Sequence, residues 1–69
     1  MENYDINCYL GRFGDEEKLF SIGNKYCRIP TKGEFIYFDD EMYKVLYTMT
    51  DVDNKEVAVF VREAIEEDF

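Results

Sequence analysis

Apolar and polar residues alternate most regularly between positions 34 and 62. A period of two is typical of a strand with one buried face. The segment therefore predicts three consecutive antiparallel strands, with loops at residues 39–42 and around residues 52–54. One face of the resulting sheet is expected to be entirely apolar, and it consists of Ile36, Phe38, Tyr43, Val45, Tyr47, Met49, Val57, Val59 and Val61.

The register of the three strands follows from keeping these apolar residues together, because a slip of one residue would turn a whole strand over. In the first hairpin Phe38 is expected opposite Tyr43 and Ile36 opposite Val45. In the second hairpin the expected pairs are Val45 with Val61, Tyr47 with Val59, and Met49 with Val57. Asn54 is expected to take the left-handed conformation in the second loop, which asparagine tolerates.

The opposite face of the predicted sheet carries an apolar row where water is expected. Phe35, Leu46 and Phe60 form this row, and Tyr37 and Ala58 flank it. There are two interpretations. In one, a terminal segment covers the row with Ile65 and Phe69; in the other, the row is an interface for a twin subunit or a target protein.

The remaining segments complete an all-β pattern. Residues 3–10 alternate as a half-buried strand, and residues 18–27 predict a second strand with a bulge or bend at Gly23 and Asn24. Residues 64–69 predict a short helical turn or a tail. We therefore expect a single domain over residues 1–69, built as a small five-stranded antiparallel meander or barrel with a short C-terminal helical turn.

The turn from Pro30 to Gly33 and Glu34, followed by Ile36, Tyr43 and Val45, resembles the pattern of small uncharacterised SH3-like β-barrel proteins from phages and gut bacteria. The resemblance covers residues 30–62. It implies an SH3-like barrel and a phage or mobile-element origin, and it implies no activity. The chain departs from the pattern at Asp40 and Glu41, where such hairpins often have glycine.

Charge narrows the classes of partner. The chain has 69 residues, of which 16 are acidic and 8 are basic, so its formal net charge is −8. A negative field repels nucleic acid and anionic lipid, and it attracts basic proteins. We expect no direct nucleic-acid contact and no membrane contact. The alternative interpretation of the acidity is that it only keeps a small protein in solution.

Composition argues against an enzyme. The chain has no histidine, which excludes nucleophilic catalysis through that residue. Cys8 and Cys27 match no zinc spacing and are expected to be free thiols in a reducing compartment. No cofactor or metal is expected. The chain has no signal-peptide pattern and no long apolar run, so we expect a cytoplasmic protein, in the host cytoplasm if a phage encodes it.

Acidic residues cluster in four places: 15–17, 39–41, 51 and 53, and 66–68. Projected around a barrel, such clusters could imitate the phosphate spacing of a nucleic acid and bind a partner's Arg and Lys side chains. The alternative is that they are ordinary solvated turns.

Three hypotheses follow. The leading one is a non-enzymatic protein that binds and inhibits or modulates a host protein that is basic or binds nucleic acid. Its expected interface consists of Phe35, Tyr37, Leu46, Phe60, Asp39, Asp40, Glu41, Asp51 and Asp53. The second is a homo-oligomeric sponge for a nucleotide or other small ligand, held at a subunit junction by Arg12, Lys25, Arg28 or Arg62. The third is a minor structural component of a virion.

Overall fold

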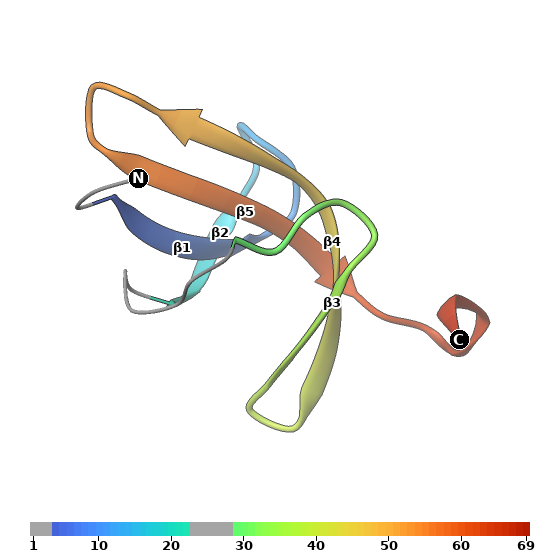
Figure 1. Ribbon diagram of the computed structural model, residues 1–69. Coiled ribbons are helices and arrows are strands. Elements are labelled where there is room, and N and C mark those ends of the chain that lie inside the picture. The colour runs from blue at the N-terminus through green and yellow to red at the C-terminus, as the bar shows by residue number, and fades with distance from the viewer. Residues whose placement is uncertain (1–3, 23–28) are drawn as a thin grey trace.

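The computed structural model describes residues 4–22 and 29–69. These residues form one five-stranded sheet with the strand order β2-β1-β5-β4-β3 (Figure 1). The elements are β1 (Asp5–Leu10), β2 (Glu17–Ser21), β3 (Phe35–Phe38), β4 (Glu41–Asp51), β5 (Glu56–Glu63) and a 3-10 turn, η1 (Glu66–Asp68). The expected all-β fold and the C-terminal helical turn are confirmed. The predicted second strand, 18–27, is described only as far as residue 22.

The expectation that the sheet is fully antiparallel is wrong. Strand β1 runs parallel to β5, with Asp5 beside Glu56 and Leu10 beside Val61. The physical reason lies in β5, whose five residues from 57 to 61 are all buried. A strand buried on both faces is typical of the centre of a sheet, and β5 reaches that position by lying between β1 and β4.

The core lies mainly on one face of the sheet. Val57, Val59 and Val61 project into it from β5, and they pack with Ile6 and Cys8 of β1. Tyr43 and Val45 of β4 complete the buried cluster. The valine-rich face of the predicted sheet is therefore the interior.

The hairpin between β3 and β4 turns more tightly than expected. Its loop consists of Asp39 and Asp40 alone, and Ile36 pairs with Tyr43 instead of Val45. Both aspartates adopt the left-handed conformation, with φ of 54° and 65°, which two-residue hairpin turns require. The register differs from the expected one by two residues, so the same side chains still share a face.

The hairpin between β4 and β5 contains a bulge that the sequence pattern does not reveal. Val45 pairs with Val61 as expected, but the register shifts between Val45 and Tyr47. Tyr47 then pairs with Phe60 instead of Val59. Because a bulge adds one residue to one strand, every later residue of β4 faces the opposite way from the expectation.

Two further residues of this hairpin differ from the expectation. Met49 pairs with Ala58 instead of Val57. In the turn, Lys55 has the positive φ that was expected for Asn54. Asn54 instead caps the turn, since its backbone N–H and its side-chain amide both donate to Asp51.

The sheet curls until its two edges approach each other. Strands β2 and β3 lie at opposite ends of the strand order, and yet the rings of Phe20 and Phe38 stack with centroids 4.0 Å apart. The β3–β4 hairpin extends away from the other strands, as Figure 1 shows. Within the described ranges, no helix is long and apolar enough to cross a bilayer.

Candidate functional site

The structure does not bring Phe35, Leu46 and Phe60 together as one exposed row. Phe60 is only 1% exposed, because the rings of Tyr9, Phe13 and Tyr47 surround it at centroid distances of 5.7, 6.3 and 5.1 Å. The bulge in β4 causes this difference by placing Tyr47 directly beside Phe60. The predicted row is therefore wrong as a contiguous surface, and Phe60 belongs to a second, smaller core.

The loop between β1 and β2 covers this second core. Gly11 begins the loop with a φ of 107°, and a Cβ at this position would lie 2.9 Å from the carbonyl oxygen of Asp15. Only glycine fits such a turn without strain. The loop is then fixed on the sheet by the N–H of Phe13, which donates to the Tyr47 hydroxyl at 2.9 Å.

The C-terminal segment covers part of Phe35. The ring of Phe69 stacks on the ring of Phe35 with centroids 5.0 Å apart. Covering by Phe69 was one of the two interpretations of the apolar row, and the contact agrees with it at Phe35. Ile65, the other expected cover, is 52% exposed. The three residues of the predicted row thus have three different surroundings, and Leu46 lines a cavity instead.

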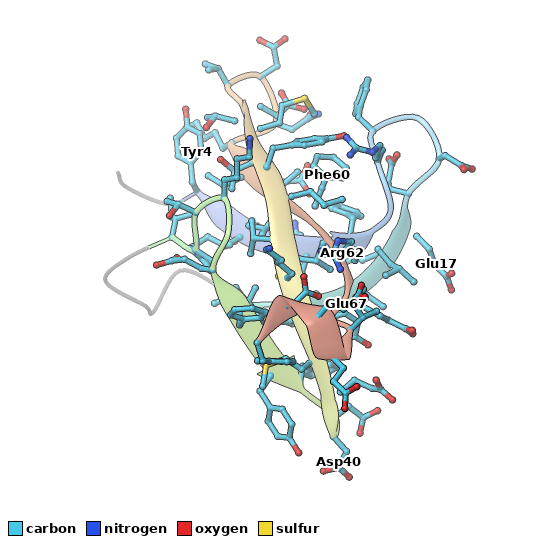
Figure 2. The ribbon with its side chains drawn as sticks, turned by 90° about the vertical axis from the view of Figure 1, so that its right-hand side faces the viewer. Tyr4, Glu17, Asp40, Phe60, Arg62 and Glu67 are labelled. Atoms are coloured by element: carbon cyan, nitrogen blue, oxygen red, sulfur yellow. The ribbon has the colours of Figure 1, made fainter. Side chains whose placement is uncertain are left out.

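The β3–β4 hairpin gathers five of the predicted interface residues: Phe35, Tyr37, Asp39, Asp40 and Glu41. Tyr37 is 65% exposed, and Phe38 beside it is 40% exposed. The Tyr37 hydroxyl donates to the carboxylate of Asp40 at 3.1 Å, so the aromatic and acidic parts of the hairpin are in contact. Asp40 lies at the far end of the molecule in Figure 2.

Asp51 and Asp53 lie away from this hairpin tip. Strand β4 is 11 residues long and has the β3–β4 turn at one end and the β4–β5 turn at the other. The carboxylate of Asp51 accepts the two hydrogen bonds from Asn54, at 3.2 and 2.9 Å, and these bonds lower the pKa of Asp51. Asp51 therefore stabilises its own turn, and the structure does not join it to the hairpin tip.

A group of cations lies where β4, β5 and two loops meet. Arg12 and Arg62, two of the four residues expected to hold a small ligand, line one cavity with Lys32 and Lys44. Lys25 and Arg28, the other two, lie outside the described residues. Sequence reasoning missed Lys32 and Lys44, because their approach depends on the pairing of β3 with β4, which the alternation alone gets wrong by two residues.

The carboxylate of Asp68 in η1 binds two of these cations. Arg62 donates to both of its oxygens, at 2.8 and 3.0 Å, and Lys44 Nζ lies 3.5 Å away. The N–H of Ile65 donates to the same carboxylate at 2.7 Å. These contacts, with the Arg62 hydrogen bonds first, hold the pKa of Asp68 well below its usual range. Figure 2 shows Arg62 beside the C-terminal turn.

A polar cluster on the Phe60 side of the sheet also escaped the sequence analysis. The Tyr9 hydroxyl and the Asn7 side chain both donate to Glu56. The hydrogen bond to this carboxylate, together with burial, raises the pKa of Tyr9 to about 12. The cluster forms because β1 and β5 run parallel, and the expected antiparallel meander gave no reason to place these residues together.

Cys8 is fully buried in the core, and burial raises the pKa of its thiol to about 11. A thiol with a raised pKa is a poor nucleophile and a poor metal ligand. Cys27 lies outside the described residues. Within 4–22 and 29–69, no three Cys, Asp or Glu side chains are placed to hold a metal ion.

Comparison of the chain with protein-family models, with curated proteins and with solved structures finds no match.

Proposed function

We propose that this chain is a non-enzymatic binding protein that engages a protein partner through the β3–β4 hairpin. The observation that carries the proposal is Tyr37, an aromatic residue that is 65% exposed on an edge strand. Large exposed aromatic residues are enriched in the centres of protein interfaces. The proposed interface consists of the predicted interface residues that lie on this hairpin, and it leaves out the predicted interface residues elsewhere in the chain.

The backbone of β3 also favours partner binding. Val45 N–H donates to the carbonyl oxygen of Glu34 at 2.8 Å, so this carbonyl group points toward β4. Among the described residues, β3 pairs with β4 alone. Because successive residues of a strand point their backbone groups to opposite sides, the groups of Phe35 and Tyr37 point away from β4. An open edge can accept an extended segment of another protein as an added strand.

The hairpin tip indicates the chemistry of the partner. Asp39, Asp40 and Glu41 place three acidic residues next to Tyr37, on a chain whose net charge is −8. Such a field attracts a positively charged surface and speeds its association. The proposed occupant of the edge is therefore an extended segment of a basic protein with Lys or Arg side chains that reach the tip.

The backbone conformation of the hairpin tip also supports a binding role for its carboxylates. Both Asp39 and Asp40 are left-handed. Aspartate is common at the first position of such a turn, but glycine is preferred at the second, which Asp40 occupies. Residues kept in costly conformations are concentrated at functional sites. We infer that the carboxylates are retained at the tip for binding.

Three finer parts of this proposal rest on the sequence. The SH3-like likeness is supported by five strands in a curled sheet, whereas the parallel pairing of β1 with β5 departs from the antiparallel meander that the strand pattern predicted. A phage origin and a host target rest on the same likeness. Nucleic-acid mimicry has weaker support, because Asp51 and Asp68 use their carboxylates within the chain.

Photo-crosslinking from the hairpin tests the proposal. A photoreactive phenylalanine analogue is placed at position 37 in one variant and at position 13 in a control, since Phe13 is similarly exposed at 66% on a different loop. In a bacterial lysate, the proposal expects a protein adduct from position 37 that salt weakens and that Asp39→Asn with Asp40→Asn reduces. Equal adducts from both positions, or an adduct indifferent to the two Asn substitutions, would contradict it.

Sedimentation separates a foreign partner from a second copy of this chain. If the protein forms a dimer that Tyr37→Ala disrupts, the occupant of the edge is a twin and the proposed basic partner is wrong. A monomer at all concentrations, together with a position-37 adduct of a different mass, supports the proposal.

A further inference from the structure

Half of the basic residues of this acidic chain line a single cavity. The chain contains 8 Lys and Arg residues, and Arg12, Lys32, Lys44 and Arg62 line a cavity of about 410 Å³. Leu46 and Tyr47 contribute an apolar wall. The volume falls within the range of about 300–1,000 Å³ that is usual for small-molecule sites.

The charges around this cavity do not balance. Asp68 forms ion pairs with Arg62 and Lys44. Elsewhere in the described part of the chain, no carboxylate lies within ion-pair distance of Arg12 or Lys32. The lining of the cavity therefore carries an excess of positive charge, on a chain whose net charge is −8. Clustered like charges repel each other, and an anion bound between them would relieve that repulsion.

We propose that this cavity binds a small phosphate monoester attached to a planar ring, such as a nucleoside monophosphate. A phosphate monoester carries a charge of about −1.5 to −2 at neutral pH, which suits the local excess better than a single carboxylate does. Arginine side chains match the geometry of phosphate oxygens. The site lies within one chain. It shares Lys44 with the base of the β3–β4 hairpin, where Lys44 pairs with Phe35, and it does not include the hairpin tip at Asp39 and Asp40.

Arg12 and Tyr47 supply the surface for the ring. The Arg12 guanidinium lies 5.7 Å from the centroid of the Tyr47 ring, so both planar groups stand at the same side of the cavity. Aromatic rings and guanidinium planes both stack on nucleobases. The net charge of −8 disfavours a long nucleic acid, because the chain would repel its many phosphates. One small dianion interacts mainly with the cations of the cavity.

Asp68 is a competitor for this ligand. Its carboxylate already shows that Arg62 can hold two oxygens at once, at 2.8 and 3.0 Å. It reaches the cations from η1, a turn of three residues none of which is buried as a whole. A phosphate that enters the cavity must draw Arg62 and Lys44 from Asp68, so removal of that charge should strengthen binding.

Isothermal titration calorimetry at low salt tests the inference with adenosine 5′-monophosphate, ribose 5-phosphate, adenosine and inorganic phosphate. Adenosine 5′-monophosphate is expected to bind most tightly, ribose 5-phosphate more weakly, and adenosine not measurably. Equal binding of adenosine and its monophosphate would overturn the role of the cations. Absence of heat for every probe at millimolar concentration would overturn the site itself.

Matched variants localise the site. Lys32→Gln is expected to weaken binding of adenosine 5′-monophosphate about 5- to 10-fold, as loss of one charged hydrogen bond does. Lys18→Gln is the control, because Lys18 is an exposed residue of β2 and does not line the cavity. An equal loss in both variants would mean diffuse attraction and overturn the inference.

The last variant tests whether Asp68 competes with the phosphate for Arg62 and Lys44. Asp68→Asn is expected to tighten binding about 3- to 10-fold, since it removes the charge that competes for Arg62 and Lys44. A thermal melt of each variant confirms that the protein is folded. Binding that does not tighten in folded Asp68→Asn would overturn the competition.

Discussion

The ring of Phe20 stacks on the ring of Phe38, with centroids 4.0 Å apart and an angle of 18° between the rings. The two residues belong to β2 and β3, the first and last strands in the order of the sheet. Their contact therefore links β2 with β3 across the curled sheet.

Replacement of Phe38 should weaken this link between β2 and β3. Phe38→Ala is expected to lower the free energy of unfolding by about 1–2 kcal/mol, because Phe20 loses the ring that stacks on it. The loss is modest because Phe38 is partly exposed. Tyr37→Ala is the control and should change it by less than about 0.5 kcal/mol. Urea denaturation measures both. Equal losses of unfolding free energy in the two variants would mean that the Phe20–Phe38 contact does not stabilise the fold.

The hairpin tip should become more stable when it loses an aspartate. Asp40 has a φ of 65°, so Asp40→Gly is expected to raise the free energy of unfolding by about 0.5–1 kcal/mol. Asp53→Gly is the matched control, because Asp53 itself does not have a positive φ and glycine there adds only disorder to the unfolded chain. Chemical denaturation that shows both variants destabilised would contradict the strain at position 40.

Acid should weaken the attachment of the C-terminal turn. Arg62 and Lys44 hold the pKa of Asp68 below its usual range, so its contribution to stability is present above the ordinary aspartate pKa of about 3.9. That contribution is lost as the pH falls below this value toward the lower pKa of the folded state. The difference in unfolding free energy between the native chain and Asp68→Asn should therefore shrink toward acid pH. A difference that stays constant down to pH 2 would argue against the ion pairs.

Alkali should weaken the polar cluster at Glu56. The pKa of Tyr9 is raised to about 12, above the ordinary tyrosine value of about 10. The stabilisation is full below pH 10 and is lost as the pH rises toward 12. Burial also raises the pKa of Tyr43, so ultraviolet titration should show a late phase that loses one tyrosine in Tyr9→Phe. Glu56→Gln keeps a hydrogen-bond acceptor at position 56 and removes its charge. The pKa of Tyr9 should therefore fall, and Tyr9 should titrate at a lower pH.

Cys8 should resist alkylation while the protein is folded. Its thiol is fully buried and has a pKa of about 11, so little thiolate is present near neutral pH. With Cys27→Ser in the background, reaction with iodoacetamide at pH 8 should be slow in buffer and fast in denaturant. Rapid reaction in buffer would mean that the core opens readily at β1.

Alternation along the chain was sufficient to predict an all-β fold and the interior residues of β5. It works there because Val57, Val59 and Val61 face a continuous core, and a period of two identifies such a face directly. The C-terminal helical turn was also predicted. The alternation did not predict the parallel pairing of β1 with β5, and it made the loop after Phe38 two residues too long.

The errors have local physical causes. A bulge between Val45 and Tyr47 leaves no mark on the alternation, yet it decides which face Tyr47 occupies. Phe60 was therefore expected at the surface and is buried. The cavity also depends on long-range pairing, because Arg12 and Arg62 are 50 positions apart (62 − 12) and approach only in the folded sheet. Alternation reports which face a residue takes within one strand, and it does not report which strands become neighbours.

The parallel pairing of β1 and β5 also determines the order of events during synthesis. Asp5 pairs with Glu56, which the ribosome adds 51 residues later (56 − 5). Until then the nascent β1–β2 hairpin has no strand against which to lay its apolar side, and an isolated hairpin is marginally stable in water. Pairing across such a separation is slow, because a large loop must close first. Folding should therefore begin in the meander of β3, β4 and β5, with the N-terminal hairpin docking last.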